Sequence, residues 1–394
     1  MKLLFVVQRY GADITGGSEY HCRAIAQRLA GRGHEVAVAT TCAADYVTWR
    51  NVLTPGVSQD GPVTVHRFQV ARERPLGAFW TLSERVFDGR ASEAEQQEWF
   101  ALNGPDAPDL LGFLREHGRD YDRVILFAFR YAPSWFGLPL VADRAILMPT
   151  AEDDELIRSA TILGPYFASP RGFFFNTPEE KAMIARLVDR QLPPSVTIGC
   201  GVDPPGPPPS RVALDGLDIP QDFFLYVGRV DRNKGCDALV RHYGAYVEGL
   251  APGETALPLV LAGPVVLQLP QIPGLRILGR VSDEVRDALL THARALVMPS
   301  PYESLSLVVL EAWNRGTPVI VNARCDVLLG QVRRADGGLY YRTSDDFAGA
   351  IRRLAIDPQL AAALGQQGLA YVDRTYRWSR ILNEIEQLLS SLSG

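Results

Sequence analysis

The chain has 394 residues, of which 47% are hydrophobic and 22% charged, and its formal net charge is −5. Such a composition is typical of a globular protein, and this length exceeds one ordinary core, so two domains of about 200 residues each are expected. The net charge leaves no broad basic field for nucleic acid. The five cysteines are scattered without CxxC spacing, and no run approaches the ~20 apolar residues of a membrane span, so a cytoplasmic protein is expected.

The chain begins as a strand, a glycine loop and a helix. Residues 3–7 form a continuous apolar run suited to a buried parallel strand. After Gly16-Gly17, helical spacing continues to Ala30, with Ser18 as the expected N-cap, and a second strand follows at 35–40. This βαβ opening predicts a parallel, doubly wound sheet. Further strands are expected at 64–70, 123–129, 145–149 and 172–176.

A long irregular segment, at about 71–105, interrupts this series. It carries Trp80, Trp99 and Phe100. Loops of this length are uncommon unless they are functional or disordered, and aromatic side chains favour packing. We therefore expect helices here, packed near the face of the domain.

A break in composition separates the two halves. Six of the seven residues at 203–209 are proline or glycine, so neither a helix nor a central strand can pass through them. We predict an N-terminal domain at 1–203, a proline-rich linker at 204–215 and a C-terminal domain at 216–376. A last amphipathic helix at 377–394 could pack back on the N-terminal domain. Strands of the second half are expected at 223–227, 259–262, 275–278, 295–298 and 318–321, with helices at 283–293 and 307–315 among those between them.

Two doubly wound α/β domains joined by a linker predict a cleft, and ligands of such sheets bind at the carboxyl ends of strands. Arg229 and Lys234 lie between Gly228 and Gly235, directly after an expected strand. Such a loop suits a diphosphate, because backbone N–H groups approach the anion while arginine and lysine supply charge. The alternative is a solvated basic turn. Gly17, in the first glycine loop, stands at the start of a helix whose N-terminus could be a second anion site, and the alternative is an ordinary tight turn.

Two carboxylates in the second half point to hydroxyl groups. Glu303 ends the loop after an expected strand, and Glu311 lies eight residues further on, in the next helix. A buried carboxylate needs hydroxyl or N–H partners, which sugars and ribose offer. The alternative is a pair of unrelated surface charges.

Together these motifs resemble family 4 of the retaining glycosyltransferases with the GT-B fold. The resemblance covers nearly the whole chain. The motifs that carry it are Gly16-Gly17-Ser18-Glu19, Gly228-Arg229, Lys234-Gly235, Ala262-Gly263-Pro264, Leu278-Gly279-Arg280-Val281, Glu303 with Glu311, and Gly337-Gly338.

The resemblance implies a retaining, metal-independent transfer of a sugar from a nucleoside diphosphate sugar, such as a UDP- or GDP-sugar, which is a co-substrate and not a cofactor. It implies that Glu303, Arg229 and Lys234 are catalytic. The residues it implies for donor binding are Gly17, Gly228, Gly263, Arg280, Val281, Ser306, Leu307, Val308 and Glu311. No metal site is expected, because the acidic runs 152–155 and 345–346 read better as solvated helix starts.

Acceptor residues are harder to assign. Related sequences often place a histidine where Glu152 stands, and glycines where Ser304 and Ser306 stand. We expect Glu152 and Arg130 to be acceptor residues. Four other residues at strand ends are candidates, namely Arg9, Tyr10, Phe129 and Tyr131, and packing in the scaffold is the alternative for Phe129 and Tyr131. The acceptor is expected to be a small molecule or glycan, and peripheral membrane contact stays open.

Several alternatives remain at this point. Retention could proceed through a covalent intermediate or by front-face departure, and no second carboxylate is an obvious nucleophile. The same fold could serve an epimerase or a phosphorylase, although no lysine stands in a setting that matches pyridoxal phosphate. A non-catalytic subunit that binds sugar nucleotides is a third possibility.

Overall fold

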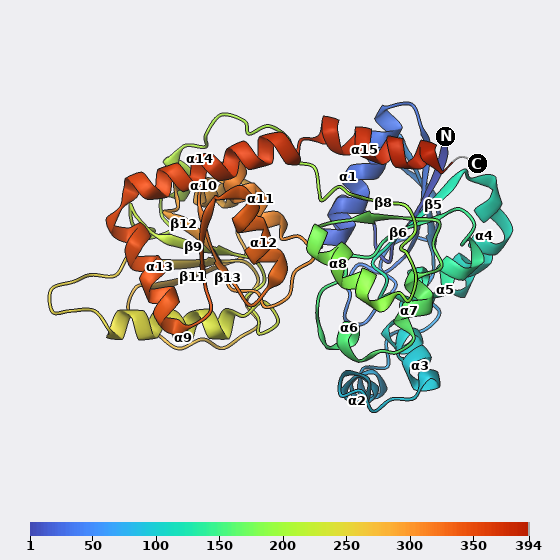
Figure 1. The fold of residues 1–394 in the computed structure, drawn as a ribbon, viewed down its shortest axis with the longest axis horizontal. Coiled ribbons are helices and arrows are strands. Elements are labelled where there is room, and N and C mark those ends of the chain that lie inside the picture. The colour runs from blue at the N-terminus through green and yellow to red at the C-terminus, as the bar shows by residue number, and fades with distance from the viewer. Residues whose placement is uncertain (393–394) are drawn as a thin grey trace. The chain divides into compact units, whose positions relative to one another are not determined.

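The structure is a computed structural model, and it describes residues 1–392. Contacts divide the chain into two compact units (Figure 1). Unit 1 comprises Met1–Gly199 together with the chain from Ile381 onward, and unit 2 comprises Cys200–Arg380. The segment 204–215, expected as a linker, lies within unit 2, where His292 Nε2 lies 3.1 Å from the carbonyl oxygen of Pro209. Each unit is an α/β sheet covered by helices, as the sequence predicts.

Unit 1 contains an eight-stranded sheet in the order β3-β4-β2-β1-β5-β6-β7-β8, in which only the β3–β4 pair is antiparallel. Its strands are β1 (Lys2–Val6), β2 (Glu35–Thr41), β3 (Gly56–Asp60), β4 (Val63–Phe68), β5 (Arg123–Phe127), β6 (Ala145–Met148), β7 (Gly172–Phe175) and β8 (Ser195–Thr197). Its helices are α1 (Gly17–Gly31), α2 (Leu76–Phe87), α3 (Glu93–Asn103), α4 (Pro108–His117), η1 (Gly118–Asp120), α5 (Ala132–Gly137), η2 (Leu138–Leu140), α6 (Glu155–Ser159), α7 (Leu163–Phe167) and α8 (Pro178–Leu187).

The central strands form because their apolar runs are buried on both faces, as parallel sheets require. The edge strands β3 and β8 escape prediction, since β3 is polar and largely exposed and β8 has only three residues. Ser18, the expected N-cap of α1, does not hold that position. Gly16 holds that position, and Ser18 lies inside the first turn, where its hydroxyl donates a hydrogen bond to Glu19.

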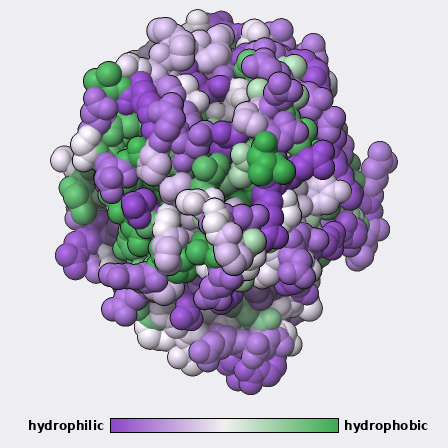
Figure 2. Space-filling view, turned by 90° about the vertical axis from the view of Figure 1, so that its left-hand side faces the viewer, coloured by the Kyte–Doolittle hydropathy of each residue, from purple (hydrophilic) through white to green (hydrophobic). Residues whose placement is uncertain are grey.

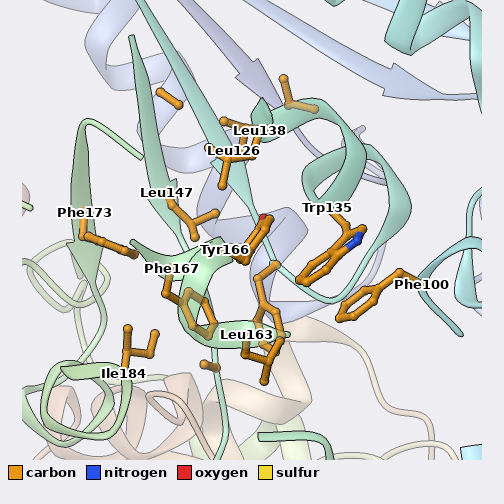
Figure 3. Close-up of a cluster of buried hydrophobic side chains, with 14 of the residues drawn as sticks. Phe100, Leu126, Trp135, Leu138, Leu147, Leu163, Tyr166, Phe167, Phe173 and Ile184 are labelled. Atoms are coloured by element: carbon orange, nitrogen blue, oxygen red, sulfur yellow. The ribbon is translucent and has the colours of Figure 1, made fainter. Parts of the chain in front are cut away.

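The expected helices in the 71–105 segment are confirmed as α2 and α3. Aromatic side chains attach them to the core of unit 1 (Figure 3). Phe100 stacks on Trp135 at 3.6 Å between ring centroids, and Trp135 stacks on Tyr166 at 4.3 Å. Stacked aromatic pairs add stability beyond the apolar area that they bury. The segment is therefore part of the folded core and not a free loop.

Unit 2 contains a six-stranded, wholly parallel sheet in the order β11-β10-β9-β12-β13-β14. Its strands are β9 (Phe224–Val227), β10 (Leu259–Ala262), β11 (Leu275–Gly279), β12 (Ala295–Met298), β13 (Val319–Asn322) and β14 (Gly338–Tyr341). Its helices are η3 (Arg211–Leu214), α9 (Cys236–Glu248), α10 (Asp283–His292), α11 (Leu307–Asn314), α12 (Asp326–Ala335), α13 (Ser344–Ile356) and α14 (Pro358–Thr375). Figure 2 shows a face of unit 2 on which hydrophilic residues predominate and hydrophobic ones are scattered.

The last helix, α15 (Trp378–Ser391), begins in unit 2 and continues into unit 1. Within unit 1, Glu386 accepts a hydrogen bond of 2.6 Å from Arg32 and lies 3.1 Å from His34 Nε2. A Cβ added to Gly172 on β7 would lie 3.0 Å from Leu392. These contacts make the second half of α15 part of the first unit.

Candidate active site

The first part of the candidate site is the loop between β9 and α9, which carries Arg229 and Lys234. Its shape is held by Asp231, whose carboxylate accepts hydrogen bonds from the Arg229 side chain and, at 2.8 Å, from the Lys234 backbone N–H. The hydroxyl of Tyr226, on β9, donates to the Arg229 carbonyl at 2.7 Å. Both cationic side chains therefore start from a rigid loop at the carboxyl edge of the sheet, where ligands bind in folds of this kind.

Gly235 brings this loop against the next one. Its φ is 72°, in the left-handed region, and an added Cβ would lie 2.5 Å from the carbonyl oxygen of Pro299. Only glycine meets both conditions without strain. The loop after β12 is thereby placed next to the cationic loop.

Lys234 and Glu303 form an ion pair across that junction. Nζ lies 2.7 Å from Oε1, and only 10% of the Glu303 side chain is exposed, against 34% for Lys234. The two residues are 69 positions apart in the chain. The structure thus joins two motifs that the sequence shows only separately, and it pairs the buried carboxylate with a cation, as burial requires.

The start of α11 follows Glu303 directly. Ser306 is its N-cap, with φ 69° and ψ 84°, a conformation that favours glycine. Its side chain is 6% exposed, and its hydroxyl has no hydrogen-bond partner within residues 1–392. Leu307 and Val308 form the first turn, where free backbone N–H groups point away from the helix. This end of α11 carries the partial positive charge of a helix N-terminus.

Glu311, one turn further along α11, has a partner that the sequence does not indicate. Arg286, on α10, donates a hydrogen bond to its Oε2. Burial raises the pKa of Glu311, and Arg286 opposes this shift. Oε1 accepts no hydrogen bond from any residue of the described chain. One oxygen is therefore available to a ligand hydroxyl while the other fixes the side chain.

Glycines shape the remaining donor loops of unit 2. Gly263, after β10, has φ 142°, and an added Cβ would overlap the Gly228 carbonyl oxygen. Its N–H donates to the Gly279 carbonyl at 2.8 Å. Gly228, Gly263 and Gly279 therefore lie side by side at the carboxyl ends of neighbouring strands. Arg280 is exposed and Val281 is partly buried just after Gly279.

The glycine loop of unit 1 surrounds a buried ion pair. Gly17 is the first residue of α1 and is exposed. Glu19 lies in the first turn, and its Oε1 accepts hydrogen bonds from Arg9 at 2.5 and 2.9 Å and from Gln8 at 2.9 Å. Both charged side chains are 5% exposed. Arg9 is therefore committed to Glu19, and Tyr10 and Phe129 are fully buried, so these three side chains pack in the scaffold.

The proposed acceptor residues Arg130 and Glu152 follow β5 and β6. Arg130 donates to Asp154, the N-cap of α6, at 2.6 Å. The loop that carries Glu152 is held by Glu180, which accepts the Ala151 backbone N–H at 2.6 Å. Burial raises the pKa of Glu180 to about 8. Glu180 was not singled out from the sequence, because a glutamate in the first turn of a helix is common.

Comparison with known proteins identifies the family. Residues 216–370 match the family described as Glycosyl transferases group 1. A D-inositol 3-phosphate glycosyltransferase of Nocardiopsis dassonvillei is 31% identical over 427 aligned positions, which cover 95% of this chain and 89% of that protein. The chain belongs to this family. It is a glycosyltransferase, as the sequence motifs indicate.

Solved structures show that this glycosyltransferase has the expected GT-B fold. Sucrose-phosphate synthase from Thermosynechococcus elongatus superposes with a TM-score of 0.73 at 21% identity, over 99% of this chain and 98% of that one. HepE from Anabaena, in complex with UDP, gives a TM-score of 0.67 at 15% identity, over 99% and 100%. Among residues 1–392 of the glycosyltransferase, no group of three or more histidine, cysteine or acidic residues could hold a metal ion. No helix within that range is long and apolar enough to cross a membrane.

Proposed function

We propose that this glycosyltransferase moves a sugar from a nucleoside diphosphate sugar to a hydroxyl group of a small acceptor, with retention of anomeric configuration and without a metal. The observation that carries the proposal is the Lys234–Glu303 pair, because it joins a diphosphate-binding loop to a buried carboxylate beside a helix N-terminus.

The chemistry needs negative charge to be stabilised on the departing nucleoside diphosphate. Arg229 and Lys234 supply two cations, each oriented in advance by a carboxylate, Asp231 and Glu303 respectively. Backbone N–H groups at Leu307 and Val308 add the partial charge of the α11 N-terminus. These groups offer a diphosphate charged and backbone hydrogen bonds without a metal, which supports metal-independent transfer.

The two carboxylates are suited to different parts of the donor. Glu303 lies beside the expected diphosphate and would face the sugar, where it can accept a hydroxyl or stabilise positive charge at the anomeric carbon. Glu311 has Oε1 available while Arg286 holds Oε2, which suits a ribose hydroxyl. Gly263, Arg280 and Val281 end the neighbouring strands and would line the base. The UDP complex of HepE supports a uridine nucleotide as the first donor to test.

The acceptor is assigned to unit 1, at the carboxyl ends of its strands. Arg130 and Glu152 stand there after β5 and β6 and are the proposed acceptor residues. Gly17 would let the start of α1 approach the donor diphosphate. A cytoplasmic location, where nucleotide sugars are made, is proposed with this activity.

Turnover and binding test the proposal together. Nucleotide release from UDP- and GDP-sugars should require an acceptor, resist EDTA and give a product with the donor's anomeric configuration by NMR. An isomerised donor formed without acceptor would instead indicate an epimerase. A product of inverted anomeric configuration would contradict retention. Loss of activity in EDTA that added metal restores would contradict metal independence.

Calorimetry with the nucleoside diphosphate tests the cations directly. Arg229→Ala and Lys234→Ala should each weaken binding by about 1.5–3 kcal/mol, the usual value of a charged hydrogen bond. Arg232→Ala is the matched control, since Arg232 is exposed in the same loop. Equal affinity in wild type and both site variants would refute the assigned roles.

A further inference from the structure

Arg67 is a cation of unit 1 without a counter-ion. It lies on β4, in register with Thr40 of β2, one residue before β4 ends. The side chain is partly buried, and Nη1 is buried without a hydrogen-bond partner. Within residues 1–392, the guanidinium makes no hydrogen bond or ion pair. Burying part of a charged side chain without a partner costs free energy, so this guanidinium is suited to an anionic ligand.

Asp60, the carboxylate that interacts with Arg67, is already neutralised. Asp60 accepts two hydrogen bonds from Arg23, at 2.7 and 2.9 Å, and a third from Gln27 at 3.0 Å. These bonds to Arg23 lower the pKa of Asp60. In the first turn of α1, Glu19 is likewise committed to Arg9. Arg23 thus takes up the charge of Asp60, which leaves Arg67 without a direct ion pair.

The other ionisable neighbours of Arg67 carry no charge. Burial raises the pKa of the Cys42 thiol and of the Tyr10 hydroxyl, so both are neutral near pH 7. Tyr10 follows β1 and Cys42 follows β2, so the three residues mark the carboxyl ends of adjacent strands. This is the edge at which α/β sheets bind ligands.

The loop after β1 faces Arg67. A Cβ added to Gly11 would lie 3.7 Å from Nη2, which is an ordinary contact distance, so the loop backbone lies close to the guanidinium. The residues that follow, Ala12 and Asp13, are exposed.

We propose that Arg67 binds a compact oxyanion of the acceptor, a phosphate monoester or a carboxylate, in unit 1. The inference rests on the proposed function, because it assigns this edge of unit 1 to the acceptor. It adds the acceptor's chemical class, since an arginine fork pairs with phosphate or carboxylate oxygens through two parallel hydrogen bonds.

The test uses the full chain, saturated with UDP so that the donor site is occupied. Calorimetry then measures the affinity for glucose 6-phosphate, glucuronate and glucose in wild type, Arg67→Met and the control Arg72→Met. Arg72 is close by in the chain but exposed, with 59% of its side chain accessible. Methionine keeps the length of the aliphatic stem without the charge.

We expect Arg67→Met to weaken binding of the charged ligand at least about tenfold, while Arg72→Met leaves it unchanged. Preference for glucose 6-phosphate identifies a phosphate monoester, and preference for glucuronate a carboxylate. The melting temperature of Arg67→Met should equal or exceed that of wild type, because an unpaired buried charge is removed.

Three results would overturn the inference: equal affinity in wild type and Arg67→Met, no preference for either anion over glucose, or a fall of several degrees in the melting temperature of Arg67→Met. Different measurements test the proposed function. It would fail if the chain did not bind nucleotide, or if Lys234→Ala left the affinity for UDP unchanged, and neither measurement involves Arg67.

Discussion

Ser306 offers a sharp test of how the donor site is built, because two unfavourable features coincide there. Its backbone has φ 69°, which costs a residue other than glycine about 1–2 kcal/mol. Its hydroxyl is buried and unpaired within the described chain, at a cost of about 1–3 kcal/mol. Ser306→Gly removes both costs.

The net gain is smaller than their sum. Glycine loses more backbone freedom on folding, by about 0.5–1 kcal/mol. We therefore expect Ser306→Gly to raise the free energy of unfolding of unit 2 by about 1–4 kcal/mol. For a unit of this size, each kcal/mol raises the melting temperature by about 2–4 °C. Ser306→Ala keeps the strained backbone and removes only the hydroxyl, so it should fall short of the glycine variant by up to about 1.5 kcal/mol.

Urea unfolding, followed by tryptophan fluorescence, measures both variants, and calorimetry with UDP shows whether the site survives. Nucleotide affinity should persist in Ser306→Gly, because the backbone N–H groups at the start of α11 remain. Destabilisation by both substitutions would refute the reasoning, since it would mean that the hydroxyl has a native partner. A stabilising alanine with a destabilising glycine would refute the strain argument alone.

Three further predictions concern other parts of the molecule. Glu303→Gln should lower kcat by about 10²–10³-fold with little change in nucleotide affinity, as expected for a group that acts on the transition state. A kcat within about threefold of the wild-type value would exclude that role. His21 is buried, and burial lowers the pKa of its imidazole to about 3. As pH falls, the unfolded chain therefore takes up a proton on His21 before the folded chain does, and the free energy of unfolding decreases below about pH 6.5. Between pH 7.5 and 5.5, wild type should lose about 1.4 kcal/mol more than His21→Gln in urea titrations, and parallel pH profiles would contradict this. Gly263→Ala should abolish nucleotide binding, because the added Cβ would overlap a backbone oxygen. A Cβ added to Gly279 meets nothing within 4 Å, so Gly279→Ala should cost only about 1–2 kcal/mol in stability. Equal effects of the two substitutions in thermal-shift assays would count against the overlap.

Most central strands could be predicted because their signal is local. The runs at 259–262 and 295–298 match β10 and β12 to the residue, since a short apolar run that is buried on both faces needs no distant information. The edge strands of unit 1 lack that signal. β3 is polar and exposed, so only its antiparallel pairing with β4 identifies it.

The candidate site divides in the same way. The residue types of the cationic loop and of the two glutamates indicate their chemistry, but their partners lie far away in the chain. Arg286 meets Glu311 only because α10 packs beside α11. Arg9 was one of several acceptor candidates in the sequence, and only the structure shows that Glu19, in the first turn of α1, holds its side chain.

By itself, the sequence determined a GT-B glycosyltransferase with a cationic glycine loop and two carboxylates in its second half, since these are properties of short segments. Tertiary structure alone decided that Lys234 pairs with Glu303, that Ser306 is strained and that Arg67 lacks a counter-ion. Charge pairing, desolvation and backbone strain depend on which loops meet at a sheet edge. That meeting is set by strand order and register, which no single segment contains.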